Sequence, residues 1–214
     1  RQSLTPCLTG LPHPPWLPFF CNVDYENYPS REETMRKIIE ELEDPNVRMI
    51  GLYGLSGVRK TTLVKEVVKK VLKDKMFDVV TMASATRDPD IRKIQAQIAD
   101  ILGVILDEES DIARAARIHK VLNNEKKSTL IILDDLWGKV DLNMLGIPCE
   151  MENDDGLKNV KEGKSPTDLS MAKRVKTEET LRRYKGYRIL MISESKHVLL
   201  SQMEVRADYI FTVE

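Results

Sequence analysis

Residues 51–64, "GLYGLSGVRKTTLV", lie between an apolar run and a segment with helical periodicity. They place four residues at the spacing of a phosphate-binding loop: Gly54, Gly57, Lys60 and Thr61. Such a loop needs glycines for sharp turns, a helix N-terminus behind the phosphates, a lysine for the outer phosphates and a hydroxyl for Mg²⁺. A strand–turn–helix without a ligand is the alternative, but it would not need Lys-Thr-Thr. The stretch therefore predicts a nucleotide site.

A second apolar run, "LIILDDLW", ends in Asp134 and Asp135. A magnesium–nucleotide site needs a carboxylate at the end of a strand close to the phosphate-binding loop. The alternative is that both acids are turn residues at a strand end. Together with the loop upstream, they favour a metal-dependent nucleotide site.

Composition bounds the classes of protein that this chain can be. Of its 214 residues, 42% are hydrophobic and 31% are charged, with a net charge of −1, which is typical of a soluble globular domain. The near-neutral charge argues against an obligate nucleic-acid binder, and no apolar run reaches the roughly 20 residues of a membrane span. Cys7, Cys21 and Cys149 show no metal-ligand spacing. We interpret them as free thiols, which favours a reducing, cytoplasmic compartment.

Apolar segments of two kinds alternate along the chain. Helical periodicity predicts helices over 30–44, 60–74, 88–103 and 111–125, the first with a capping box of Ser30 and Glu33. Continuous apolar runs predict strands over 47–53, 77–84, 128–137, 186–195 and 207–214. This alternation predicts an α/β fold with a parallel sheet covered on both faces.

Two segments differ in composition from this pattern. Residues 1–29 are rich in proline and aromatic residues, and we expect an irregular N-terminal arm. Residues 30–214 form the predicted nucleotide-binding domain, with a densely charged segment at 149–185 that we expect to be a disordered insertion. Its "KRVK" leaves nuclear import or an acidic partner open, although a solvated charge run is the favoured interpretation.

Five segments, taken in order, resemble one protein family: "MIGLYGLSGVRKTTLVKEV", "FDVVTMASATRDPDIRKIQAQIADILG", "LIILDDLW", "DLNMLGIP" and "GYRILMISESKHVLLSQM". They are similar to the motifs of the NB-ARC domain of plant disease-resistance proteins, which are intracellular immune receptors with leucine-rich repeats. Trp137 after the two acids resembles the coiled-coil class of these receptors. The resemblance runs from about Ser30 to Pro148 and resumes at Gly186.

The resemblance implies a P-loop NTPase three-layer fold, with a five-stranded parallel sheet in the order 2-3-1-4-5. It implies an ADP/ATP-binding switch in plant innate immunity that uses Mg²⁺ and is at most a very slow ATPase. Thr61 and Asp134 would hold the metal, and Asp135 would be the candidate catalytic base. The nucleotide-binding residues carried over by position are Arg31, Gly54, Gly57, Val58, Arg59, Lys60, Thr61 and Thr62.

The chain also departs from the family pattern at the site. Arg59 and Ser56 replace loop glycines, Glu194 stands where the family has an arginine that senses the γ-phosphate, and Ile192 replaces a threonine. Residues 149–185 replace a link of a few residues. These departures predict weakened nucleotide binding and little hydrolysis.

Two alternatives stay open at this point. The first is a non-catalytic decoy or adaptor that pairs with other resistance proteins or signalling partners, without nucleic acid and without a membrane span. The second is a non-functional truncated gene product, in which 149–185 would be translated intron.

Overall fold

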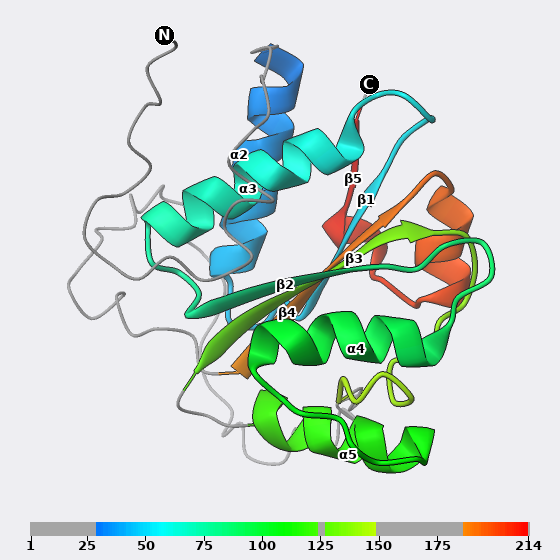
Figure 1. Cartoon of the computed structure of the whole chain (residues 1–214). Helices are drawn as coiled ribbons and strands as arrows, with labels where there is room; N and C mark the ends of the chain where they lie inside the picture. Colours follow the sequence, from blue (N-terminus) through cyan, green and yellow to red (C-terminus); the bar gives the residue numbers. More distant parts are fainter. Residues whose placement is uncertain (1–28, 124–126, 149–185, 214) are drawn as a thin grey trace, which may run out of the picture.

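The computed structural model describes residues 29–123, 127–148 and 186–213, which form three layers with a parallel sheet in the middle (Figure 1). The helices are α2 (Pro29–Glu43), α3 (Lys60–Lys73), α4 (Ile91–Leu102) and α5 (Asp111–Leu122). The strands are β1 (Met49–Tyr53), β2 (Val79–Ser84), β3 (Ser128–Leu136), β4 (Gly186–Ser193) and β5 (Ile210–Thr212). A π-helical turn, Val198–Gln202, and a 3₁₀ turn, Ala207–Tyr209, connect β4 to β5.

The sheet has five parallel strands in the order β2-β3-β4-β1-β5. The predicted fold class, an α/β fold with a five-stranded parallel sheet, is confirmed. The expected strand order 2-3-1-4-5 is wrong in one respect: β4, not β1, lies next to β3, and β1 lies between β4 and β5. Strand β4 pairs with β3 through Ile132 and Leu190, while β1 pairs with β4 and β5. All the strands are apolar runs of similar composition. Hydrophobicity therefore does not predict which strands pair with each other.

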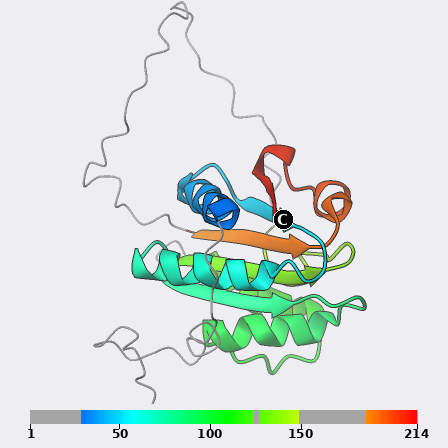
Figure 2. The ribbon, with the colours of Figure 1, turned by 90° about the horizontal axis from the view of Figure 1, so that it is seen from above.

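Two hydrophobic cores lie on opposite faces of the sheet. Leu130 and Ile132 of β3 pack with α2 and α3, while Ile131 and Leu133 pack with α4 and α5. All four side chains are 0% exposed, as expected of a strand covered on both faces. In Figure 1, α2 and α3 lie above the sheet and α4 and α5 below it, and Figure 2 looks down on the upper layer.

Most element boundaries match the predicted ones within a few residues, and the helix ends show why. The carboxylate of Asp90 accepts from the backbone N–H of Lys93 at the start of α4, and Gly103 ends that helix with a φ of 69°. The predicted capping box at Ser30 is wrong because α2 already begins at Pro29. Proline suits the first helical position, since its fixed φ is helical and no N–H is needed there. Glu33 pairs instead with Arg36, at 2.7 Å.

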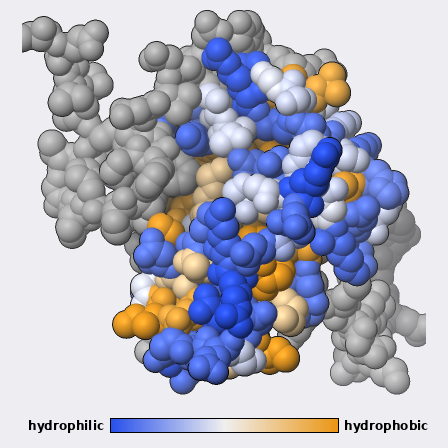
Figure 3. Space-filling view, turned by 45° about the vertical axis from the view of Figure 1, so that its right-hand side comes forward, coloured by the Kyte–Doolittle hydropathy of each residue, from blue (hydrophilic) through white to orange (hydrophobic). Residues whose placement is uncertain are grey.

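The surface is mainly hydrophilic on the face shown in Figure 3, with apolar side chains in smaller groups. Large exposed apolar side chains include Leu55, Ile105, Ile112 and Trp137. None of the helices in the described ranges has the length and apolar character needed to cross a membrane. The predictions for the N-terminal arm, the three cysteines and the insertion concern residues outside the described ranges, apart from Pro29.

Candidate functional site

The loop that joins β1 to α3 depends on its two glycines. A Cβ atom at Gly54 would lie 2.6 Å from the backbone carbonyl oxygen of Val213, directly after β5. Gly57 has a φ of 84°, which side chains rarely tolerate, although open space surrounds it. The two glycines therefore serve different ends: one allows close packing and the other allows a turn.

Arg59 occupies a left-handed backbone conformation, with a φ of 59° and a ψ of 41°, directly before the first residue of α3. The loop thus requires at this position the positive φ that glycine provides. A residue with a Cβ pays about 1 kcal/mol for that conformation. The Arg59 side chain is exposed and borders the cavity described below.

The first turn of α3 offers a site for an anion. It contains no acidic residue, and the Arg59 side chain makes no capping hydrogen bond. Backbone N–H groups at a helix start lack partners within the helix and favour negative charge. The ammonium group of Lys60 lies close by and donates to the carbonyl oxygens of Gly54, at 2.7 Å, and Leu55, at 2.9 Å. Two sources of positive charge therefore meet at this loop.

Thr61 and Asp134 meet across 73 residues of sequence, where the Thr61 hydroxyl donates to Oδ2 of Asp134 at 2.8 Å. Burial raises the pKa of the Asp134 carboxyl above its ordinary value of 3.8, although hydrogen bonds from Thr61 and the Asp135 backbone oppose this. An adjacent cation would favour the ionised form of this carboxylate.

A β-bulge brings the two acids to the same side. Between the pairs Leu133↔Met191 and Leu136↔Ser193, β3 has two residues, Asp134 and Asp135, opposite one residue of β4. Asp135 has a φ of 59°. Consecutive residues of a regular strand point to opposite faces, whereas a bulge can redirect one of them. Both carboxylates accordingly border one cavity.

This cavity, of about 440 Å³, is bordered by the loop, the start of α3 and the carboxyl ends of β2, β3 and β4. Its lining residues are Ser56, Gly57, Arg59, Lys60, Thr61, Ser84, Asp134, Asp135, Ser193 and Glu194. Sequence reasoning missed Ser84 and Ser193. Each is the last residue of its strand, and the carboxyl ends of parallel strands meet at one edge, so this signal could have identified them.

The remaining predicted site residues lie around this cavity rather than in its lining. Arg31, on α2, donates from its guanidinium group to the carbonyl oxygen of Val58 at 3.5 Å, which places the two beside the loop. Gly54, the first residue of the loop after β1, is buried. Thr62 is partly buried on α3 and is not among the lining residues.

The donor set suits magnesium bound together with a phosphate. Thr61 and Asp134 supply hard oxygen atoms, which Mg²⁺ prefers. Within the described ranges, no group of three or more His, Cys, Asp or Glu side chains could hold a metal ion by itself. Magnesium commonly binds through one or two protein oxygens, water and substrate phosphates, so the residues present fit that arrangement.

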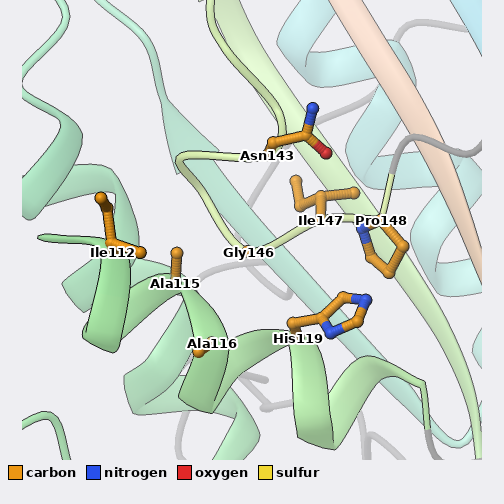
Figure 4. A pocket seen from close by; sticks show the side chains of 8 residues that line it. All are labelled: Ile112, Ala115, Ala116, His119, Asn143, Gly146, Ile147 and Pro148. Carbon is orange, nitrogen blue, oxygen red and sulfur yellow. The ribbon is translucent and has the colours of Figure 1, made fainter.

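A second cavity, of about 390 Å³, lies between α5 and the segment that follows β3 (Figure 4). Ile112, Ala115, Ala116 and His119 face it from α5, and residues 143–148 border the other side. His119 is its one titratable lining side chain. The cavity at the loop combines a helix N-terminus, cations and carboxylates, and is the better candidate.

Known proteins resemble this chain in sequence. A family model described as the NB-ARC domain matches residues 31–158. Three Arabidopsis thaliana relatives are disease resistance protein RFL1, 35% identical over 122 residues, RPS5, 37% identical over 122 residues, and SUMM2, 34% identical over 122 residues. Each match covers 55% of this chain but only 14%, 14% and 13% of the respective relatives.

Solved structures support the fold. Cdc6p from Pyrobaculum aerophilum has a TM-score of 0.56 at 14% identity, covering 88% of this chain and 46% of that one. A chain of the Drosophila ORC bound to DNA has a TM-score of 0.51 at 15% identity, covering 99% and 52%. At these identities, the likeness concerns the arrangement of strands and helices.

Proposed function

Because the chain belongs to the NB-ARC family, we propose that its described residues form an ADP/ATP-binding switch module of a plant immune receptor. The observation that carries the proposal is the contact of Thr61 with Asp134, 2.8 Å apart, beside Lys60 and the start of α3. In this proposal the domain spans 30–214, with 149–185 as an insertion. We place the protein in the cytoplasm, with the nucleus as the alternative.

The binding roles follow from the contacts at the loop. The Lys60 ammonium, which contacts two loop carbonyls, would turn its N–H groups to the outer phosphates. The start of α3 would receive the same anion through backbone N–H groups. Thr61 and Asp134 would hold Mg²⁺, which would neutralise part of the phosphate charge. Arg31, beside Val58, would lie near the adenine.

The proposal also assigns a hydrolytic role. Asp135 borders the cavity and is the candidate base for orienting a water molecule. Glu194 borders the same cavity, where a negative charge opposes the transfer of a phosphoryl group. We therefore expect any ATP turnover to stay well below about 1 s⁻¹, the lower end of ordinary enzyme rates.

Isothermal titration calorimetry with ADP and Mg²⁺ tests the binding function. The variant Lys60→Ala should lose at least about tenfold in affinity, because an ammonium–phosphate contact is removed. Lys73→Ala is the matched control, since Lys73 is an exposed lysine in the last turn of the same helix. Equal affinities of the two variants, or no binding of ADP by the parent chain, would reject the proposed function.

A non-catalytic adaptor or decoy is the second candidate function. Arg59 at the strained loop position and Glu194 in the cavity both oppose strong phosphate binding. Such a module would pair with other resistance proteins or signalling partners through the same fold. Failure of both the parent chain and Arg59→Gly to bind ADP would favour it. A non-functional gene product is a third candidate, and transcript sequencing across 149–185 would test it.

A further inference from the structure

Trp137 makes two contacts that connect separate strand ends. Its indole N–H donates to Oδ1 of Asp135 at 2.9 Å. The guanidinium carbon of Arg87 lies 4.6 Å from the centroid of the same ring. Arg87 follows β2 and Trp137 follows β3, two strands that pair up to Ser84 and Asp134. The three side chains therefore form a chain of contacts at the rim of the phosphate cavity.

Asp135 needs such a contact to have a defined orientation. Its backbone is in the left-handed region at a bulge, and its side chain is exposed. An exposed carboxylate in this setting can adopt several rotamers at little cost. Within the described ranges, the Trp137 indole is the hydrogen-bond donor that contacts this carboxylate. It holds Oδ1, so that Oδ2 is available at the rim of the cavity.

Trp137 in turn needs a contact that holds its ring. The side chain is large and apolar, yet Trp137 is 42% exposed. A guanidinium group over an indole face is attracted by the negative charge density of the ring. An exposed contact of this kind shifts the ratio of held to free tryptophan rings by about two- to fivefold.

We propose that Trp137 is a positioning residue for Asp135 and that Arg87 sets the position of Trp137. The proposal rests on the proposed function in one respect, which is that Asp135 borders the nucleotide cavity. It adds a role for two residues that lie outside the cavity lining. It also makes Trp137 an internal reporter of that cavity, because the indole shares a hydrogen bond with one of its carboxylates.

The chain contains two tryptophans, so Trp16→Phe leaves Trp137 as the one source of tryptophan emission. In this background and without nucleotide, we would measure time-resolved anisotropy and iodide quenching of Trp137. Arg87→Met and Asp135→Ala should each increase ring mobility and quenching, by about two- to fivefold in the ratio of free to held rings. Arg87→Lys keeps a cation and should restore part of the effect.

Arg206→Met is the matched control, because the exposed Arg206 lies over another aromatic ring, that of the partly buried Tyr209, at 5.2 Å. It should leave the Trp137 signals unchanged. If Arg87→Met and Asp135→Ala behave like Arg206→Met, the contacts do not hold the ring and the proposal is rejected.

A second measurement connects the contact chain to the site. Addition of Mg²⁺–ADP should change the emission of Trp137, and Arg87→Met, at a residue outside the cavity lining, should reduce that change while calorimetry still detects ADP. Calorimetric binding without any change in emission would overturn the positioning role and leave the proposed function intact. Absence of calorimetric binding would instead reject the proposed function, and the nucleotide-free measurements would then decide the positioning role alone.

Discussion

Arg59 shows how a single residue can oppose the function of a loop that surrounds it. Its left-handed backbone, with a φ of 59°, costs about 1 kcal/mol for a residue with a Cβ atom. Arginine is also a good phosphate ligand, so its charge could compensate. Strain acts on the backbone that presents N–H groups to the phosphates, whereas the charge helps only after that backbone has formed. We therefore expect the strain to dominate.

Arg59→Gly should raise the affinity for ADP by at least about tenfold, or roughly 1.4 kcal/mol. Glycine adopts the required φ without strain, and its backbone N–H can approach the phosphate closely. Calorimetry of the variant and the parent chain, at one Mg²⁺ and salt concentration, measures the difference. An unchanged or weaker affinity would show that the loop tolerates arginine.

Asp134 predicts a pH dependence of stability in the absence of metal. Burial raises its pKa above the ordinary value of 3.8, so folding takes up a proton in the pH range above 3.8. Stability of the nucleotide-free protein should therefore fall as the pH rises through that range. Asp134→Asn removes the charge while its amide oxygen can still accept from Thr61, so the variant should melt at a higher temperature at neutral pH.

Thermal unfolding in EDTA at several pH values checks this prediction. The advantage of Asp134→Asn should shrink toward zero below pH 3.8, where the parent carboxyl is protonated in both the folded and the unfolded states. A difference that stays constant with pH would contradict it.

At the scale of elements, the loop and β5 depend on each other through Gly54. A Cβ atom there would lie 2.6 Å from the Val213 carbonyl oxygen. A Cβ atom at Gly57 would contact nothing within 4 Å, so a substitution there is strained only by the positive φ. Gly57→Ala should cost about 1 kcal/mol. Gly54→Ala should cost about 2 kcal/mol or more, because rigid backbone must move. Urea unfolding measures both, and the reverse order would contradict the close packing of the loop against the segment after β5.

The bulge in β3 is an element that the sequence did not reveal. The apolar run and its two acids correctly predicted a strand that ends near the loop. A regular strand would place Asp134 and Asp135 on opposite faces, and no glycine or proline marks the irregularity. The bulge arises from pairing with β4, in which Leu133 and Leu136 pair with Met191 and Ser193. Pairing over such a distance is a tertiary property.

At the scale of the whole molecule, local chemistry was predictable and spatial neighbours were not. Gly54, Gly57, Lys60 and Thr61 are recognisable because one loop needs all of them within eight residues. The positions of β1 and β4 in the sheet depend on which strands pair. The apolar runs are similar to one another, so no single run predicts its partner. The contact of Arg87 with Trp137 joins residues that follow different strands, so no local sequence pattern predicts it.

Charge balance over the whole cavity predicts which nucleotide the molecule prefers. Three lining carboxylates, from Asp134, Asp135 and Glu194, face the cations Arg59 and Lys60. Magnesium offsets the charge of Asp134, but Glu194 is partly buried and would repel the additional negative charge of a γ-phosphate. We therefore expect Mg²⁺–ADP to raise the melting temperature more than an equal concentration of a non-hydrolysable ATP analogue, because the more tightly bound ligand stabilises the fold more.

Glu194→Gln should narrow that difference and Glu194→Arg should reverse it, with the ratio of affinities shifting toward the triphosphate by about tenfold for the change to glutamine. Glu43→Gln is the matched control, since Glu43 is an exposed acid that ends α2 and lies outside the cavity lining. Differential scanning fluorimetry over a range of ligand concentrations provides both affinities. If Glu194→Gln and Glu43→Gln leave the preference equally unchanged, Glu194 does not sense the γ-phosphate position and the preference must come from the loop around Arg59.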